Sequence, residues 1–110
     1  MTKVEGQLCK FTNVVKGWQY RWFVLDTSNM VLEERDGKSR ARQEMEGALV
    51  IPSEENSHTF SINFSSWRVY KVRAAEARER QLWVDKLRAC TSSMFIVETG
   101  SHREIRSNWY

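Results

Sequence analysis

The residues of this sequence that could do chemistry are cations gathered around one short turn. Lys10, Lys16 and Arg21 all lie within residues 5–26. This segment is typical of two strands joined by a loop, because β-branched, aromatic and large apolar residues fill both arms and Gly17 lies at the turn. If the strands pair, Lys10 and Arg21 lie side by side at the mouth of the hairpin. A Lys point charge beside an Arg fork suits a ligand with several negative charges, such as a phosphate group.

The tip of the same loop carries two apolar residues, Val14 and Val15, which have no predicted core to enter. An exposed apolar tip next to cations suits an anionic headgroup that sits in an apolar surface. We therefore expect Val14, Val15 and Lys16 to form a membrane wedge, in which burial of the two valines contributes at most about 3 kcal/mol. The alternative is ordinary packing of the turn against a neighbouring part of the chain.

The hairpin resembles the start of a pleckstrin-homology (PH) domain. The residues that carry the resemblance are Glu5-Gly6-x-Leu8-x-Lys10-x-Thr12-Asn13-x-x-x-Gly17-Trp18-Gln19-x-Arg21-Trp22-Phe23-Val24-Leu25. Their Lys-x-Thr-Asn and Gly-Trp-Gln-x-Arg combination is similar to the subgroup found in oxysterol-binding-protein-related lipid-transfer proteins and the four-phosphate adaptor proteins. The resemblance covers residues 4–90 and is weakest over residues 33–46.

The resemblance implies a module that recruits a lipid-transfer-type protein to phosphoinositide-bearing membranes. The lipid implied by the subgroup is phosphatidylinositol 4-phosphate, and the implied location is cytoplasmic and peripheral, on Golgi or endosomal membranes. The headgroup residues that it implies are Lys10, Arg21, Thr12, Asn13, Trp18 and Gln19.

Some of these assignments keep two interpretations. Thr12 and Asn13 either hydrogen-bond to the ligand or hold the turn through bonds to the backbone. Trp18 either forms a wall of the ligand site or an interfacial anchor, or belongs to the core. The related adaptors also engage small GTPases, so the alternative function is a protein-interaction domain on the same fold with weak or no lipid binding. The acidic loop at residues 53–56 and the exposed helix face would then be the surfaces to test.

Length and charge predict one small basic domain. The 110 residues carry a net charge of +3, with a pI near 9.1. We expect a PH-like domain over residues 4–92, a mobile tail over residues 93–110, and a monomer. Cys9 and Cys90 are far apart and lack metal-ligand spacing, and no secretory signal is visible, so we expect a cytosolic protein with two reduced, buried thiols.

Catalysis and nucleic-acid binding are the disfavoured function classes. The sequence shows no Ser/His/Asp set, paired carboxylates, phosphate loop or metal cluster, and His58 and His102 are isolated in polar settings. We therefore expect no enzyme activity, no cofactor and no metal. Five tryptophans and a basic pI would suit single-stranded nucleic acid. We expect no such partner, because most of the aromatic residues fall at positions predicted to face the core.

The expected fold is mainly β: a barrel of two packed antiparallel sheets, with about seven strands, capped by a C-terminal helix. Strands are predicted over residues 4–11, 18–26, 48–51, 58–64 and 67–73, with another beginning at residue 30. The helix is predicted over residues 74–92, where Trp83, Leu87 and Cys90 form an apolar stripe. By its spacing and by the resemblance, Trp83 is a core residue that plugs one end of the barrel.

The segment from residue 33 to residue 46 breaks the pattern. It has few apolar residues, and Glu34 and Gln43 stand where apolar side chains are expected. The fourth strand is therefore in doubt, and we expect this segment to be the least ordered part of the domain.

Overall fold

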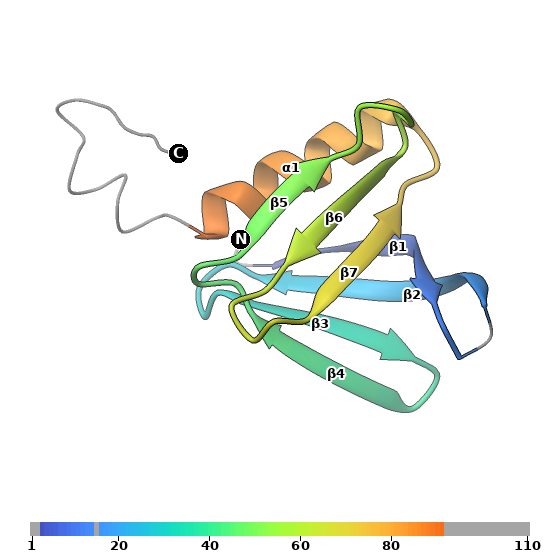
Figure 1. Cartoon of the computed structure of the whole chain (residues 1–110). Coiled ribbons are helices and arrows are strands. Elements are labelled where there is room, and N and C mark those ends of the chain that lie inside the picture. Colours follow the sequence, from blue (N-terminus) through green and yellow to red (C-terminus); the bar gives the residue numbers. More distant parts are fainter. Residues whose placement is uncertain (1–2, 15, 92–110) are drawn as a thin grey trace, which may run out of the picture.

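The computed structural model describes residues 3–14 and 16–91, which form seven strands and one helix (Figure 1). In chain order they are β1 (Lys3–Thr12), β2 (Gly17–Asp26), β3 (Val31–Asp36), β4 (Ser39–Glu44), β5 (Leu49–Pro52), β6 (Thr59–Asn63), β7 (Val69–Arg73) and α1 (Ala77–Thr91). The predicted mainly β fold with a C-terminal helix is confirmed. The predictions for Val15 and for the tail at residues 93–110 lie outside the described residues.

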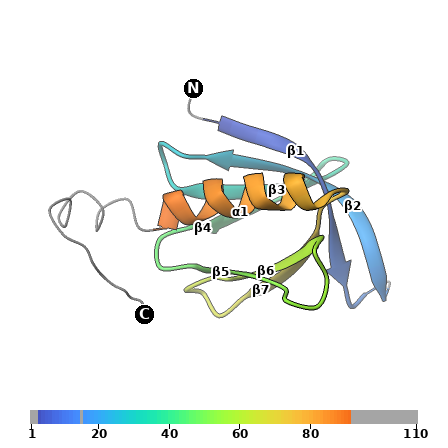
Figure 2. The ribbon, with the colours of Figure 1, turned by 90° about the horizontal axis from the view of Figure 1, so that it is seen from above.

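The strands form one antiparallel sheet in the order β4-β3-β2-β1-β7-β6-β5. The sheet bends at the junction of β1 and β7, where Cys9 pairs with Arg73 and Lys10 pairs with Val72. Its two halves, β1–β4 and β5–β7, therefore cross each other as two layers (Figures 1 and 2). The predicted barrel of two sheets is thus a single bent sheet, and it is not closed because β4 and β5 are its edges.

The core lies between the two halves of the sheet and beneath the helix. On β2, β3, β6 and β7 buried residues recur at every second position, as the period of two requires. Phe23 and Leu25 on β2, and Phe60 and Ile62 on β6, are each at most 1% exposed.

The helix covers one end of the bent sheet, and Trp83 is 3% exposed at its centre. A Cβ atom at Gly6 of β1 would lie 3.5 Å from the Trp83 ring, an ordinary contact distance, so the indole packs directly over this part of β1. The helix begins at Ala77 rather than at Ala74, because the buried Ala74 still belongs to the sheet side and donates its N–H to the His58 carbonyl at 2.9 Å. The prediction that Trp83 is a core residue is confirmed.

Two arginines of α1 tie the helix to the β5–β6 half. The Arg80 Nη1 atom lies 3.0, 2.8 and 2.9 Å from the carbonyl oxygens of Ser53, Asn56 and Thr59. Arg88 donates from Nε and Nη2 to the Val50 carbonyl at 3.1 and 2.9 Å. Charge-assisted bonds to backbone carbonyls thus fix the helix over the end of the sheet.

The fourth strand, which the sequence left in doubt, is present as β4. β3 and β4 pair along their full length, from Val31 with Glu44 to Asp36 with Ser39, and Gly37 makes the turn with a φ of 60°. The apolar pattern is missing because β4 is an edge strand whose side chains are mostly exposed. An edge strand with several arginines is also protected against pairing with other chains.

Two other sequence-based expectations are wrong in detail. The strand predicted as buried over residues 48–51 is half-buried, since Leu49 and Ile51 are 61% and 48% exposed while Val50 faces the core. β7 begins at Val69, and Trp67 before it lies in a turn with a φ of 73° and is 93% exposed. Sequence alternation alone could not show which of these strands is covered on its second face.

We expect Trp83→Ala to lower the free energy of unfolding by about 3–5 kcal/mol, because the substitution empties the centre of the core. Trp67→Ala is the matched control and should change stability by less than about 0.5 kcal/mol, since that side chain is exposed. Urea denaturation followed by circular dichroism measures both. Similar losses for the two variants would contradict the placement of Trp83.

The two cysteines should differ in reactivity. Cys90 is buried and Cys9 is half-buried, and both thiols are free. Burial raises the pKa of the Cys90 thiol, and the Asp26 carboxylate raises it further. Because the thiolate is the reacting form, Cys90 of the folded chain should react with a thiol reagent much more slowly than Cys9 at neutral pH. Peptide mapping of the labelled chain would show this, and equal rates before unfolding would contradict it.

Candidate anion-binding site at the β1–β2 hairpin

The β1–β2 hairpin brings the two predicted cations together. Lys10 is paired with Gln19 and Leu8 with Arg21, so Lys10 and Arg21 are diagonal neighbours. Both belong to the face of the hairpin that also carries the buried Leu8 and Phe23. The predicted proximity of Lys10 and Arg21 is confirmed by their contact with the same carboxylate.

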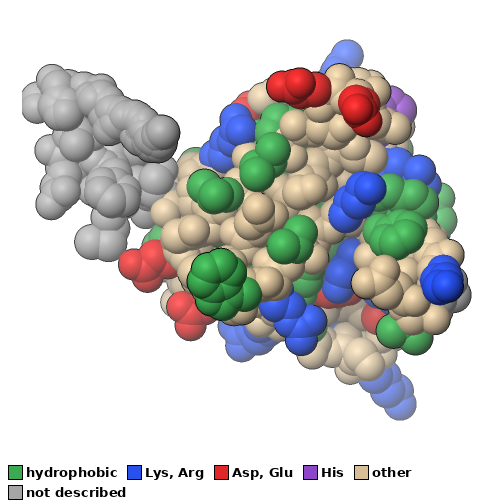
Figure 3. Space-filling view, viewed as in Figure 1, with side chains coloured by type: hydrophobic (Ala, Val, Ile, Leu, Met, Phe, Trp, Pro, Cys, Tyr) green, Lys and Arg blue, Asp and Glu red, His purple; other side chains and the backbone are tan. Residues whose placement is uncertain are grey.

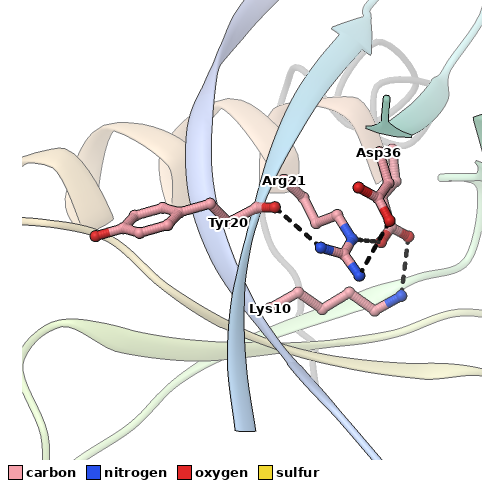
Figure 4. Close-up of polar contacts among 5 residues, drawn as sticks. Lys10, Tyr20, Arg21 and Asp36 are labelled. Carbon is pink, nitrogen blue, oxygen red and sulfur yellow. Dashed lines mark hydrogen bonds and ion pairs between the residues drawn. The ribbon is translucent and has the colours of Figure 1, made fainter. Parts of the chain in front are cut away.

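That carboxylate belongs to Glu34 of β3. Lys10 Nζ donates to Glu34 Oε1 at 2.8 Å, and Arg21 Nε lies 3.3 Å from Glu34 Oε2. Arg21 also donates from Nη1 to the Tyr20 carbonyl at 3.0 Å, and its Nη2 lies 3.5 Å from Asp36 Oδ2. Figure 4 shows the guanidinium between these groups, with the Lys10 ammonium pointing to the same carboxylate.

The cluster is largely removed from water. The side chains of Lys10, Arg21 and Glu34 are 19%, 16% and 9% exposed. Lys10 Nζ also lies 3.9 Å from the centre of the Tyr70 ring, a cation–π distance. Burial raises the pKa of the Tyr70 hydroxyl, and the Glu34 charge raises it further, so this group stays neutral in the neutral pH range. Charges in this setting interact more strongly than charges on an open surface.

Sequence reasoning did not include Glu34 in the site, although it marked the residue as out of pattern. Glu34 follows the buried Leu32 by two residues, so both side chains lie on the inner face of β3. A carboxylate on an inner face needs a counter-charge. Gln43, also marked, accepts a bond from Ser66 at 3.1 Å and so links edge strand β4 to the β6–β7 turn. An acidic residue at an inward-facing strand position was the signal in the sequence that could have identified Glu34 as a partner of the predicted cations.

Three other predicted headgroup residues lie around the hairpin mouth. By strand alternation, Thr12 and Gln19 belong to the same face as Lys10 and Arg21. Among the described residues, the Thr12 hydroxyl is a buried side-chain group that has no hydrogen-bond partner. Asn13 is exposed in the turn. The Thr12 hydroxyl is therefore a polar group near Lys10 that is available to hydrogen-bond a ligand.

Trp18 lies on the opposite face of the hairpin from Lys10 and Arg21. Its ring is 5.6 Å from that of Phe11 in an edge-to-face arrangement, and the Arg73 guanidinium lies 4.3 Å from its centre. Figure 3 shows hydrophobic and basic side chains next to one another over this part of the molecule. The half-buried Trp18 is therefore neither a wall of the Lys10–Arg21 site nor a core residue, and its role as an interfacial anchor stays a prediction.

The loop tip is exposed, as a membrane wedge requires. Val14 is 95% exposed, so the alternative of ordinary packing does not hold for it. Lys16 is also exposed and has a φ of 52°, which turns the chain back into β2. Val14 and Lys16 thus project from the end of the hairpin that carries the cation pair.

The tryptophans are less buried than the sequence suggested. Of the four in the described part of the chain, Trp83 alone is buried, and Trp22 and Trp67 are 42% and 93% exposed. The argument against nucleic-acid binding from core-facing aromatics is therefore wrong for the tryptophans. No group of three or more metal-ligating side chains occurs within residues 3–14 and 16–91, and no helix there is long and apolar enough to cross a membrane.

Comparison with known proteins gives one consistent result. The family model described as "PH domain" matches residues 2–92. Human oxysterol-binding protein-related protein 11 is 46% identical over 97 residues, which are 83% of this chain but 13% of that protein. The solution structure of that protein's PH domain covers 96% of this chain and 90% of its own, with 38% identity and a TM-score of 0.75.

A more distant structure shares the fold alone. The C-terminal PH domain of pleckstrin, solved in complex with D-myo-Ins(1,2,3,5,6)P5, is 23% identical and has a TM-score of 0.73. It covers 80% of this chain, and this chain covers 93% of it. The bent seven-stranded sheet with its helix is thus an arrangement that distant sequences adopt.

The ion cluster should contribute measurably to folding. In a double-mutant cycle of Lys10→Met and Glu34→Gln, we expect a coupling free energy of about 1–2 kcal/mol, because both side chains are mostly buried and hydrogen-bonded. Urea denaturation of the parent, the two single variants and the double variant gives this value. A coupling near zero would show that the contact adds nothing to stability.

Proposed function

Because the chain belongs to the PH domain family, we propose that it is a phosphoinositide-binding module that recruits its protein to membranes. The observation that carries the proposal is the convergence of Lys10 and Arg21 on one face of the hairpin whose tip exposes Val14. This arrangement places hydrogen-bond donors for a phosphate and an exposed apolar side chain on the same hairpin. A lipid with an anionic headgroup offers the matching pair of surfaces.

The headgroup contacts follow from the donor inventory of the site. Arg21 supplies a planar fork and Lys10 a point charge for phosphate oxygens. The unpartnered hydroxyl of Thr12 and the amides of Asn13 and Gln19 supply neutral hydrogen bonds around them. Trp18 takes no part in this pocket, since it lies on the other face of the hairpin.

The electrostatic surroundings are basic despite Glu34. Within the cluster, Lys10 and Arg21 are balanced by the carboxylates of Glu34 and Asp36, so the basic character comes from the cations around it. Exposed cations flank it on two neighbouring turns, Lys16 after the hairpin tip and Lys38 between β3 and β4. Each basic residue near an anionic leaflet contributes about 1 kcal/mol.

Membrane contact at the tip supplements the headgroup. Burial of one valine side chain stabilises by about 1.5 kcal/mol, which is too little for stable attachment by itself. Stable attachment of peripheral domains combines two such contributions. We therefore propose that headgroup capture and entry of the loop tip, Val14 with Val15, act together.

The lipid we propose is phosphatidylinositol 4-phosphate, on the cytoplasmic surface of Golgi or endosomal membranes. The proposal is supported by the similarity to oxysterol-binding protein-related protein 11. The complex of the pleckstrin domain with an inositol pentakisphosphate supports the view that this fold can hold a polyanionic inositol. We further propose that the module acts as a monomer within a lipid-transfer-type protein and has no catalytic role.

Vesicle sedimentation with and without phosphatidylinositol 4-phosphate tests the proposal. Arg21→Gln should lower lipid-dependent binding by about tenfold or more, because it removes a charge-assisted contact. Val14→Glu should weaken vesicle binding strongly and leave binding of soluble inositol 1,4-bisphosphate nearly unchanged. The matched controls are Arg78→Gln on the exposed face of α1 and Val69→Glu on the outer face of β7, where the valine is 62% exposed.

The outcomes separate the alternatives. If folded Arg21→Gln binds these vesicles like the parent, the pocket is assigned to the wrong residues. If the folded parent binds no phosphoinositide vesicle and no soluble headgroup, lipid recognition is refuted. A protein-interaction domain on the same fold would then be the better description.

A further inference from the structure

We infer that Glu34 is a resident competitor for the ligand phosphate, so that the site holds a headgroup tightly only where the loop tip can also enter a membrane. The inference rests on the proposed function, because it concerns how that same site selects its ligand. Its starting point is that a carboxylate occupies the donors that a phosphate would need. The ligand class is a headgroup that bears a phosphomonoester, either on a lipid or free in solution.

The geometry of Glu34 is that of a bound anion. Its two oxygens engage both cations, Oε1 with Lys10 at 2.8 Å and Oε2 with Arg21 at 3.3 Å. A phosphate that is to reach the same ammonium and guanidinium must displace the carboxylate or share donors with it. Arg21 is further held by Asp36 and by the Tyr20 carbonyl, so its fork is already largely occupied.

Displacement has an energetic cost because the carboxylate is buried. The Glu34 side chain is 9% exposed, and it would lose charge-assisted bonds to two cations. A buried charge that loses its partner is strongly unfavourable. This cost is subtracted from the binding free energy of every headgroup, whether soluble or attached to a lipid.

The consequence is a preference that depends on the membrane. A headgroup in solution offers the site its phosphates alone, and the competition by Glu34 lowers its affinity. A lipid in a bilayer adds apolar contact with the exposed Val14 and attraction of the leaflet for Lys16. Soluble inositol phosphates are therefore poor competitors for the membrane-bound form.

The neighbouring residue provides a matched control. Glu33 lies on the other face of β3, where its carboxylate contacts Arg35 and Arg40 and not the site. Glu33→Gln and Glu34→Gln make the same change in net charge, one residue apart on the same strand. Any difference between the two variants therefore reports on the occupied site rather than on the overall charge.

The experiment compares the parent chain with Glu34→Gln and Glu33→Gln. Binding is measured to phosphatidylcholine vesicles containing phosphatidylinositol 4-phosphate, and to soluble inositol 1,4-bisphosphate by calorimetry. Glu34→Gln should raise both affinities by about tenfold or more, because a hydrogen bond to a charged group is worth about 1.5–3 kcal/mol. Glu33→Gln should raise them less than about twofold, since its carboxylate lies on the other face of β3 and is paired with Arg35 and Arg40.

The results distinguish this inference from the proposed function. If the parent binds the lipid and folded Glu34→Gln binds no more tightly than Glu33→Gln, Glu34 positions the cations instead of competing, and the inference is overturned while the function stands. If neither the parent nor Glu34→Gln binds either ligand, both are overturned. Tighter binding by folded Glu34→Gln than by Glu33→Gln, with a parent that binds the lipid, supports the competitor.

A measurement on the unaltered chain keeps the inference testable if Glu34→Gln does not fold. Soluble inositol 1,4-bisphosphate is titrated into the parent while the side-chain carboxylate carbons of glutamate are followed by nuclear magnetic resonance. Displacement predicts that the Glu34 resonance moves with ligand occupancy and that the Glu33 resonance stays nearly fixed. A Glu34 resonance that does not move at saturating ligand would overturn the inference.

Discussion

Two cations on the inner face of a β-sheet require a counter-charge, and this requirement organises the open part of the domain. Lys10 and Arg21 are held by adjacent strands at fixed register, so they cannot move apart to reduce their repulsion. Glu34 supplies the charge from β3, and Asp36 adds a more exposed carboxylate at the end of the same strand. The position of the β3–β4 hairpin against β2 is therefore coupled to the ion pairs of the site. The contacts that hold these strands together also occupy the Lys10 and Arg21 donors that the proposed ligand would need.

The opposite part of the domain has a different physical basis. There the bent sheet is completed by α1, with Trp83 filling the interior and Arg80 and Arg88 bonded to backbone carbonyls of the β5–β6 half. Apolar burial and neutral acceptors dominate this end, whereas charge pairs dominate the other. The two ends of the domain are thus held by different interactions, and Glu34 belongs to the end that depends on charge pairs.

The relation to longer proteins sets the scale of the functional conclusions. The chain spans about 13% of the length of human oxysterol-binding protein-related protein 11, and the match lies in the PH domain. Under the proposed function, membrane recognition is the part of such a protein's work that the described residues would perform.

The sequence by itself determined the fold family, the pairing of β1 with β2 and the proximity of Lys10 to Arg21, because a hairpin turn and a period of two are local properties. It also determined that Trp83 is buried, since the helix has only one narrow apolar stripe that can face the core.

Tertiary structure alone decided the rest. Glu34 reads as a defect in a strand until β3 is placed beside β2, and Trp18 changes from a pocket residue to an outer-face residue once Phe11 and Arg73 are seen around it. β4 forms without an apolar pattern because its hydrogen bonds come from β3, and an edge strand does not need a second covered face. These features depend on contacts between segments that are distant in sequence, and a local pattern does not predict which segments will be in contact.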